Sequence, residues 1–510
     1  MAKPLRRWVA GATLALLGGC SMAPAYHPPV LPAPVAYKEI PTTGDAVWRP
    51  VDTATTALPA DWWTGFGDPL LDRLEARIDS DNPTLAGALA RYDMAKATLA
   101  GARSGLFPRV ELTPNLLRNR QSDERPLRGG SQPDFYTAAT LGGDISYEAD
   151  LWGRVRNSVA SGRALAEASR DDLAAVKLAL QGQLAADFVR LRGQDQQLAL
   201  LSQTIDAFAR ADALTRNRFR GGIATGMDVG RAGALLGEAR AQYAALQADR
   251  AVTEHAIASL VGQPASIFSI PRRDAPLHLP SIPVGLPSAL LAKRPDVAAA
   301  ERRMAAANAR IGVAKAAFFP QITLGGTGGF QSTALAGLVA APNIFWAIGP
   351  GAILNLFDGG KRRADVSAAR ADWNAAAADY RARALGAFQD VEDALATLRH
   401  LDEAQAAQDQ AVRSAASTSA IALDRYIKGA ATYLDVATAQ ENLLRDQQSA
   451  LSLETQRLTA TVALARALGG GSTFARPAQV ATRFRGRRPP DAPSASASIP
   501  RDGNPSRTTP

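Results

Sequence analysis

Two aspartates lie in a stretch of sequence that occurs twice. Asp228 and Asp435 each follow a threonine by three residues, Thr225 and Thr432. This spacing is typical of a capping box, in which the two side chains accept hydrogen bonds from free N–H groups at the start of a helix. Negative charge is also favourable there, because the helix dipole is positive at that end. The pattern therefore predicts that each aspartate caps the first turn of a helix.

The two copies of this stretch share one register. The sequence FRGGIATGMDVGRA at residues 219–232 and the sequence YIKGAATYLDVATA at residues 426–439 are offset by 207 positions. Each copy interrupts two alanine-rich helical segments, and an offset that holds over many residues indicates an internal duplication. Gly222 and Gly429 lie where the chain must reverse, so we expect positive φ or a close backbone approach there.

The first residues have the pattern of a secretory signal. Residues 1–19 combine a cationic start, an apolar run and small residues. The run Val9–Leu17 spans about 14 Å as a helix, which is too short for a bilayer. The tetrapeptide LGGC that ends at Cys20 resembles a bacterial lipobox, so we expect cleavage before Cys20 and acylation of this residue, the chain's only cysteine. Ser21 at the next position implies sorting to the outer membrane; the alternative is an ordinary buried cysteine behind a simple export signal.

Charge and composition exclude several classes of function. Of the formal net charge of +9, residues 1–7 contribute +3 and residues 473–510 contribute +5, so the body is nearly neutral. Such a body lacks the basic face that nucleic-acid binding requires. No catalytic constellation, phosphate-binding loop or His/Cys cluster with metal-ligand spacing occurs. We therefore expect no enzyme, no metal and no cofactor apart from the covalent lipid on Cys20.

The helical segments have informative lengths. Both long helices, 154–220 and 361–427, have 67 residues, about 100 Å if unbroken. The helices that follow, 228–261 and 435–468, are about half as long, as is the helical segment 69–106, which we expect to break at Asn82-Pro83. Two short helices stacked end to end therefore match one long partner.

Segments of period two follow each Phe-Pro dipeptide. Residues 109–116 and 137–151 alternate apolar and polar side chains, and residues 321–330 and 344–356 do the same in the second repeat. Four strands cannot close a barrel, and open edges cannot lie in lipid. Partner chains must then complete the sheet: a dimer gives eight strands and a trimer gives twelve. The alternative is a soluble periplasmic protein with a small sheet.

Composition also divides the chain into segments. They are a lipoprotein signal peptide (1–19), a lipid-anchored Pro-rich tether (20–60), a first repeat (61–262), a linker (263–286), a second repeat (287–470) and a basic Pro/Ser-rich tail (471–510). Prolines favour an extended tether, and the scarcity of apolar residues in the tail predicts disorder.

The duplicated Thr-x-x-Asp-Val motif, the Phe-Pro strand entries and the strand exits Asp-Leu-Trp-Gly and Phe-Asp-Gly-Gly resemble TolC-type outer membrane efflux proteins. The lipobox, the Pro-rich tether and the sequence WWTGFGDP at 62–69 are similar to the NodT-like lipoprotein branch, which serves resistance–nodulation–division pumps. The resemblance implies an α+β fold built from a duplicated helix–β-hairpin–helix unit. It also implies a homotrimer with a twelve-stranded outer-membrane β-barrel continuous with a long periplasmic α-helical barrel.

The resemblance further implies a function: the exit duct of a tripartite efflux pump that exports small molecules such as drugs. Its partners would be a periplasmic adaptor (membrane fusion) protein, an inner-membrane transporter and outer-membrane lipid. The six positions Gly222, Thr225, Asp228, Gly429, Thr432 and Asp435 would form the periplasmic tips, which dock the adaptor and gate the pore. Some TolC-type tips carry a second acidic residue three positions later, where this chain has Arg231 and Thr438. A duct for protein secretion and a non-channel periplasmic coiled-coil lipoprotein stay open as alternatives.

Overall fold

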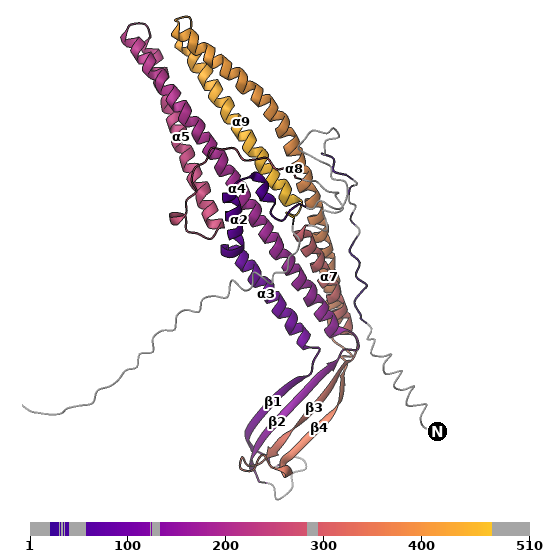
Figure 1. The fold of residues 1–510 in the computed structure, drawn as a ribbon. Helices are drawn as coiled ribbons and strands as arrows, with labels where there is room; N and C mark the ends of the chain where they lie inside the picture. The colour runs from indigo at the N-terminus through magenta and orange to yellow at the C-terminus, as the bar shows by residue number, and fades with distance from the viewer. Residues whose placement is uncertain are drawn as a thin grey trace, which may run out of the picture. The chain divides into compact units, whose positions relative to one another are not determined.

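A computed structural model describes residues 21–29, 31, 34, 36–39, 58–122, 124, 133–282 and 294–471 (Figure 1). These residues belong to one unit of the chain, Met1–Phe474. The expected signal peptide, Cys20, most of the tether's second half, residues 283–293 of the linker and second repeat, and the tail after residue 471 lie outside the described residues. None of the described helices is long and apolar enough to span a bilayer.

The element order repeats, as the sequence predicts. The first repeat contains η1 (Trp62–Phe66), α2 (Pro69–Asp81), α3 (Pro83–Ser104), β1 (Arg109–Arg120), β2 (Phe135–Ala149), α4 (Arg154–Arg220) and α5 (Gly226–Leu260). After η2 (Ala265–Ile267), the second repeat contains α7 (Pro295–Ala316), β3 (Gln321–Ser332), η3 (Ala341–Asn343), β4 (Ile344–Ile353), α8 (Lys361–Ile427) and α9 (Tyr433–Ala467). The two predicted 67-residue helices are confirmed.

Short helices meet end to end beside each long helix (Figure 1). Asn82 caps α3 by accepting from Leu85 N at 2.9 Å, and its Nδ2 donates to Leu260 O at the end of α5 at 2.7 Å. At the matching junction, Arg294 Nη1 donates to Ala467 O at 3.5 Å, which ties the end of α9 to the start of α7. Both bonds satisfy carbonyls that a helix end leaves free. The predicted end-to-end stacking is confirmed.

The described strands form one antiparallel sheet in the order β1-β2-β3-β4. Leu112 pairs with Gly143, and Leu141 pairs with Phe330. The centre of the sheet is tight, because a Cβ on Gly329 would collide with Leu141 O. Because β2 of the first repeat pairs with β3 of the second, the sheet joins the two repeats. Strands β1 and β4 lie at its edges.

Several predicted strand boundaries differ from the structure: β1 and β3 run further, to Arg120 and Ser332, β2 begins earlier, at Phe135, and β4 ends at Ile353 rather than at residue 356. Strand β2 ends at Ala149 rather than at residue 151, because Leu151 N donates to Ala149 O at 2.8 Å and the chain turns. Asp150 then caps α4 by accepting from Val155 N at 3.1 Å and from Arg156 N at 2.8 Å. Asp150 therefore stabilises the start of α4, and the alternating pattern of the strand ends before it.

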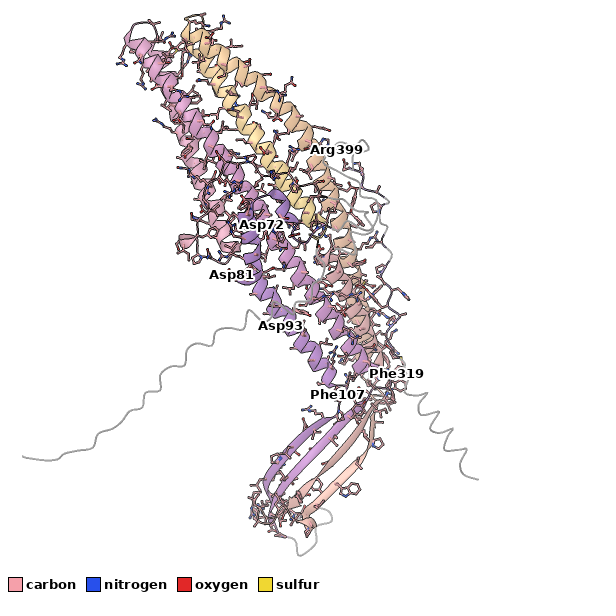
Figure 2. All side chains as sticks on the ribbon, in the orientation of Figure 1. Asp72, Asp81, Asp93, Phe107, Phe319 and Arg399 are labelled. Atoms are coloured by element: carbon pink, nitrogen blue, oxygen red, sulfur yellow. The ribbon has the colours of Figure 1, made fainter. Side chains whose placement is uncertain are left out.

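The strand entries fix the sheet to the helices. Phe107 and Phe319 lie where the helical region passes into the strands (Figure 2). Trp152 stacks on Phe319 with ring centroids 4.7 Å apart, and its Nε1 donates to Pro320 O at 2.9 Å. The Phe-Pro entry of one repeat therefore packs on the Trp-Gly exit of the other.

The main hydrophobic core joins the two repeats, because it includes Leu395 of α8 and Leu464 of α9 as well as residues of the first repeat. It packs side chains of η1 and α2, such as Phe66, Leu71 and Ile78, against Leu184 and Phe188 of α4. Next to it lies a buried ion network among Asp68, Arg192, Asp195 and Arg250. Arg192 contacts Asp68 at 3.1 Å and Asp195 at 3.1 Å, and Arg250 contacts Asp195 at 2.7 Å. The network links α2 and α5 to α4, and removing one partner would destabilise the fold because it leaves an unpaired buried charge.

Candidate functional site at the helical tips

Each tip reverses the chain at a glycine. Gly222 follows α4 with φ 73°, and Gly429 follows α8 with φ 77°. The predicted positive φ is confirmed at both positions. A Cβ at either glycine would meet nothing within 4 Å in the described part of this chain, so the alternative, a close backbone approach, does not occur there. Backbone conformation is therefore the reason for glycine at both turns.

Both predicted capping boxes are present. Thr225 Oγ1 accepts from Asp228 N at 3.2 Å, and Asp228 Oδ2 accepts from Thr225 N at 3.0 Å. In the second tip, Thr432 Oγ1 accepts from Asp435 N at 3.4 Å, and Asp435 Oδ2 accepts from Thr432 N at 2.9 Å. The hydrogen bond from Thr432 lowers the pKa of Asp435. Asp435 thus stays ionised at the positive end of its helix.

The two tips are joined by an arginine that lies just before the duplicated stretch 219–232 and was not among the predicted tip residues. Arg218, in the last turn of α4, donates to Tyr426 O at 2.7 Å and to Ile427 O at 2.8 Å. Its guanidinium also lies over the Tyr426 ring, 4.4 Å from the centroid. A basic residue in a last helical turn often binds free carbonyls, but here the carbonyls belong to α8. Only the fold brings them together.

Aromatic residues of the second tip are packed inward. The Tyr426 and Tyr433 rings meet edge to face at 5.5 Å, and both side chains are buried. Burial, with the nearby Tyr426, raises the pKa of Tyr433 to about 12. The first tip exposes Phe219, the counterpart of Tyr426, together with Ile223 and Met227, and Ile223 is 77% exposed; the second tip also exposes Ile427 and Leu434. The duplicated motif therefore has two different surfaces.

Apolar side chains are exposed on the edge strands at the other end of the helices. On β1, Val110 and Leu112 share one parity, and Val110 is 74% exposed. On β4, Ile344, Trp346 and Ile348 share one parity, and Trp346 is 75% exposed. A soluble sheet buries its apolar parity, whereas these side chains face out.

The described residues of the N-terminal segment, here called the strap (21–29, 31, 34 and 36–39), lie along the helices. Ser21 Oγ donates to Asn157 Oδ1 at 2.9 Å, in the first turn of α4. Asn308 Nδ2 on α7 donates to Pro24 O at 2.9 Å. Tyr26 then donates to the Glu301 carboxylate. Ser21 is thus held next to the sheet end of the helices.

Within the described part of the chain, no group of three His, Cys, Asp or Glu residues could hold a metal ion. The six tip residues come together in two sets of three, one at each turn. Their arrangement is that of helix caps and turns, with two carboxylates near an exposed end.

The fold defines the class of this protein as a TolC-like channel protein. The family model "Outer membrane efflux protein" matches residues 76–263 and 286–470. Among solved structures, the outer-membrane channel OprN superposes with a TM-score of 0.82 at 29% identity, over 88% of this chain and 99% of that chain.

Two curated relatives extend the comparison. The pyoverdine export outer membrane protein OpmQ of Pseudomonas putida is 32% identical over 444 residues, 84% of this chain and 93% of that protein. Nodulation protein T of Rhizobium leguminosarum bv. trifolii is 30% identical over 442 residues, 85% of this chain and 91% of that protein. The chain belongs to the outer membrane efflux protein family, whose members are outer-membrane channel proteins rather than enzymes.

Proposed function

We propose that three copies of this chain form the exit duct of a tripartite efflux pump. The duct carries small molecules such as drugs from an inner-membrane transporter of the resistance–nodulation–division type, through a periplasmic adaptor, to the outside. One observation carries this proposal. A sheet with exposed apolar edge strands is joined by α4 and α8, each about 100 Å long, to turns at the far end.

The open strand edges require partner copies of the chain, and the resemblance to TolC-type channels favours three copies over two. Each chain supplies a sheet with two open edges, β1 and β4, and unpaired edges are too costly in hydrocarbon. If β1 of one copy pairs with β4 of the next, three copies give twelve strands. Helices α4, α5, α8 and α9 of three copies then enclose the periplasmic tunnel.

We propose that acylated Cys20 anchors the chain to the outer membrane. The strap supports this, because Ser21 is bonded to the first turn of α4, beside the strands. An acyl chain on the preceding residue then lies at the membrane boundary, and several acyl chains anchor stably. Labelling with a radioactive fatty acid should mark wild type and fail to mark Cys20→Ser; label on the variant would remove this claim.

We propose that the tips dock the adaptor and close the duct. Gly222 and Gly429 set the turns, Thr225 and Thr432 cap the helices, and the tip carboxylates attract cations. Replacing Asp228 and Asp435 together with asparagine keeps cap acceptors but removes charge. We expect reduced cation preference in planar bilayers at low salt, where screening is weakest. Identical ion selectivity would leave these aspartates as caps only.

A complementation assay tests the pump assignment. The chain is expressed in an efflux-deficient bacterium with and without adaptor and transporter genes encoded beside its own. We expect drug resistance only with all three components. Secretion of a protein substrate without any change in drug resistance would favour a protein-secretion duct instead.

A further inference from the structure

The apolar face of the sheet carries charged side chains at one place. Residues that pair across antiparallel strands point to the same face, and every second residue of a strand belongs to that face. The register follows the apolar face across the sheet through Val110, Ile145, Gly326 and Ile348. Within the described strands, Arg118 and Arg120 of β1 are the charged residues on this face.

Both arginines lie at the end of β1 that is far from the helices. Strand β1 begins next to the helices at Arg109 and ends at Arg120 (Figure 1). At about 3.4 Å per residue, Arg118 lies about 27 Å and Arg120 about 34 Å along the strand from Val110. A strand tilt of about 40° reduces these lengths to about 21 and 26 Å along the barrel axis, close to the height of about 25 Å of an outer-membrane apolar band. In the barrel of the proposed function, on which this placement rests, both arginines therefore lie at the outer boundary of the hydrocarbon.

Each guanidinium contacts β2 and keeps N–H groups for another partner. Arg118 Nη1 donates to Thr137 Oγ1 at 3.0 Å, and the Arg120 guanidinium lies over the Phe135 ring, 5.6 Å from its centroid. A guanidinium has five N–H donors, and both side chains are exposed. Neither has a carboxylate within ion-pair distance among the described residues.

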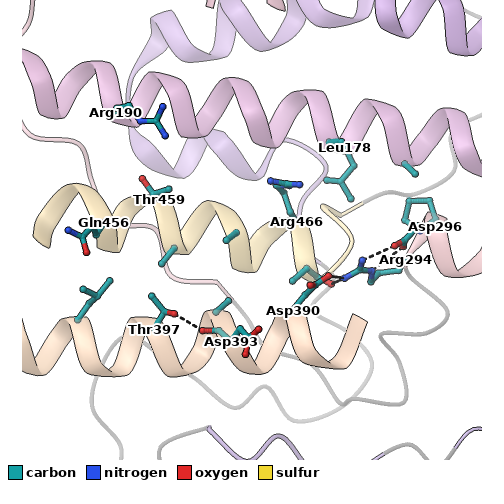
Figure 3. A pocket seen from close by; sticks show the side chains of 18 of the residues that line it. Leu178, Arg190, Arg294, Asp296, Asp390, Asp393, Thr397, Gln456, Thr459 and Arg466 are labelled. Carbon is teal, nitrogen blue, oxygen red and sulfur yellow. Dashed lines mark hydrogen bonds and ion pairs between the residues drawn. The ribbon is translucent and has the colours of Figure 1, made fainter. Parts of the chain in front are cut away.

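Arginines elsewhere in the fold commonly pair with carboxylates. Arg154, next to the other end of the sheet, contacts Glu148. Arg294, at the start of α7, contacts Asp296 and Asp390, each at 2.7 Å (Figure 3). Charged residues that face lipid are costly in the middle of a bilayer and least costly at its boundary, where charged headgroups lie.

The next copy of the chain brings no charge to this place. In the proposed trimer, β4 of one copy runs antiparallel to β1 of its neighbour, so the residues that precede β4 lie beside the end of β1. Residues 331–357 contain no Asp, Glu, Lys or Arg. The described strands of both copies therefore leave the two arginines without a counter-charge.

We propose that Arg118 and Arg120 bind the phosphate groups of one lipid of the outer leaflet, the phosphorylated glycolipid lipid A. Residues two positions apart on a strand are about 7 Å apart, so both side chains reach the same headgroup. A planar guanidinium binds phosphate through two parallel hydrogen bonds. Leu116, two positions before Arg118 on the same face, is exposed and faces the acyl chains. The proposed trimer has three such sites.

Native mass spectrometry of the detergent-solubilised full-length protein tests the proposal with lipid A and with enzymatically dephosphorylated lipid A. We expect wild type to bind lipid A about tenfold more tightly, because each of two exposed ion pairs contributes up to about fivefold. Arg118→Gln combined with Arg120→Gln should remove this preference and retain the binding of dephosphorylated lipid A, which shows that the apolar surface is intact. Inorganic phosphate at millimolar concentration should not displace lipid A; displacement would indicate a simple anion site and overturn the assignment to a lipid.

A matched control removes two arginines elsewhere. Arg109 lies on the other face of β1, next to the helices, and Arg413 is exposed on α8. Arg109→Gln combined with Arg413→Gln changes the net charge equally and should keep the preference for lipid A. Equal binding of the two lipids to wild type, or an unchanged preference in the variant of Arg118 and Arg120, would overturn the proposal. Conductance of the same wild-type preparation reports the duct separately, so a conducting channel without this preference refutes the lipid site alone.

Discussion

Glu75 on α2 carries a carboxyl group that is almost completely buried. It is 1% exposed, and both carboxylate oxygens are buried without a hydrogen-bond partner among the described residues. Burial, together with the charge of Asp79, raises its pKa from 4.5 to about 9, and Lys177 opposes this shift. The folded chain therefore holds Glu75 protonated at neutral pH.

The raised pKa of Glu75 lowers the free energy of unfolding by an amount that depends on pH. Below pH 4.5 both states carry the proton, and there is no loss of stability. Between pH 4.5 and about 9 the unfolded chain releases the proton and the folded chain keeps it, so the free energy of unfolding falls as pH rises. At about 1.4 kcal/mol per pH unit, the loss at pH 7 is about 3 kcal/mol per chain.

Glu75→Gln removes this loss, because the amide has nearly the same shape and no charge. We expect the variant to be about 3 kcal/mol more stable than wild type at pH 7 and equal to it near pH 4. Urea unfolding of the detergent-solubilised protein, followed by tryptophan fluorescence, measures the difference at each pH. Glu441→Gln, at an exposed position on α9, is the control without such a pH-dependent gain. A stability difference that is the same at both pH values would show that Glu75 is ionised in the folded chain.

Three other substitutions test parts of the structure. Arg218→Lys should loosen the tips and raise single-channel conductance, because an ammonium cannot reproduce both bonds to the α8 carbonyls and the contact with the Tyr426 ring. Unchanged conductance would show that Arg218 does not hold the duct closed. Thr432→Ala should lower helix stability by about 1 kcal/mol, measured as an earlier urea midpoint, while Thr432→Ser should not. Gly312→Leu should displace the strap, because even a Cβ there would lie 2.7 Å from Ala23 Cβ; faster proteolysis near the N-terminus is expected, and wild-type protection would contradict the described strap contacts.

Local sequence patterns were sufficient to predict the long helices and the positions of the strands. The ends of α4 and α8 coincide with glycines that adopt positive φ, Gly153 and Gly360 before them and Gly222 and Gly429 after or near their ends. Alternation located the strands, and Asn82-Pro83 located the break between α2 and α3, since proline suits a first turn. These features depend on neighbours in sequence, so one sequence reveals them.

Contacts between distant segments were not predictable in the same way. Arg218 meets Tyr426 across 208 positions, and Tyr26 meets Glu301 across 275. Nothing near Glu75 in the sequence distinguishes it from the other acidic residues of α2, and its burial results from packing against α4. The contacts of Arg118 and Arg120 with β2 likewise depend on strand register, which only the assembled sheet reveals.

Disulfide cross-linking between edge strands tests most directly whether copies of this chain close a common barrel. Leu112→Cys on β1 is combined in turn with Ile344→Cys, Trp346→Cys and Ile348→Cys on β4, in a chain whose only native cysteine is Cys20. If β1 of one copy pairs with β4 of the next, at least one combination should give a covalent trimer on oxidation of outer membranes, and each single variant should give monomers. Monomers from every combination, in protein that reaches the outer membrane, would contradict the trimeric duct.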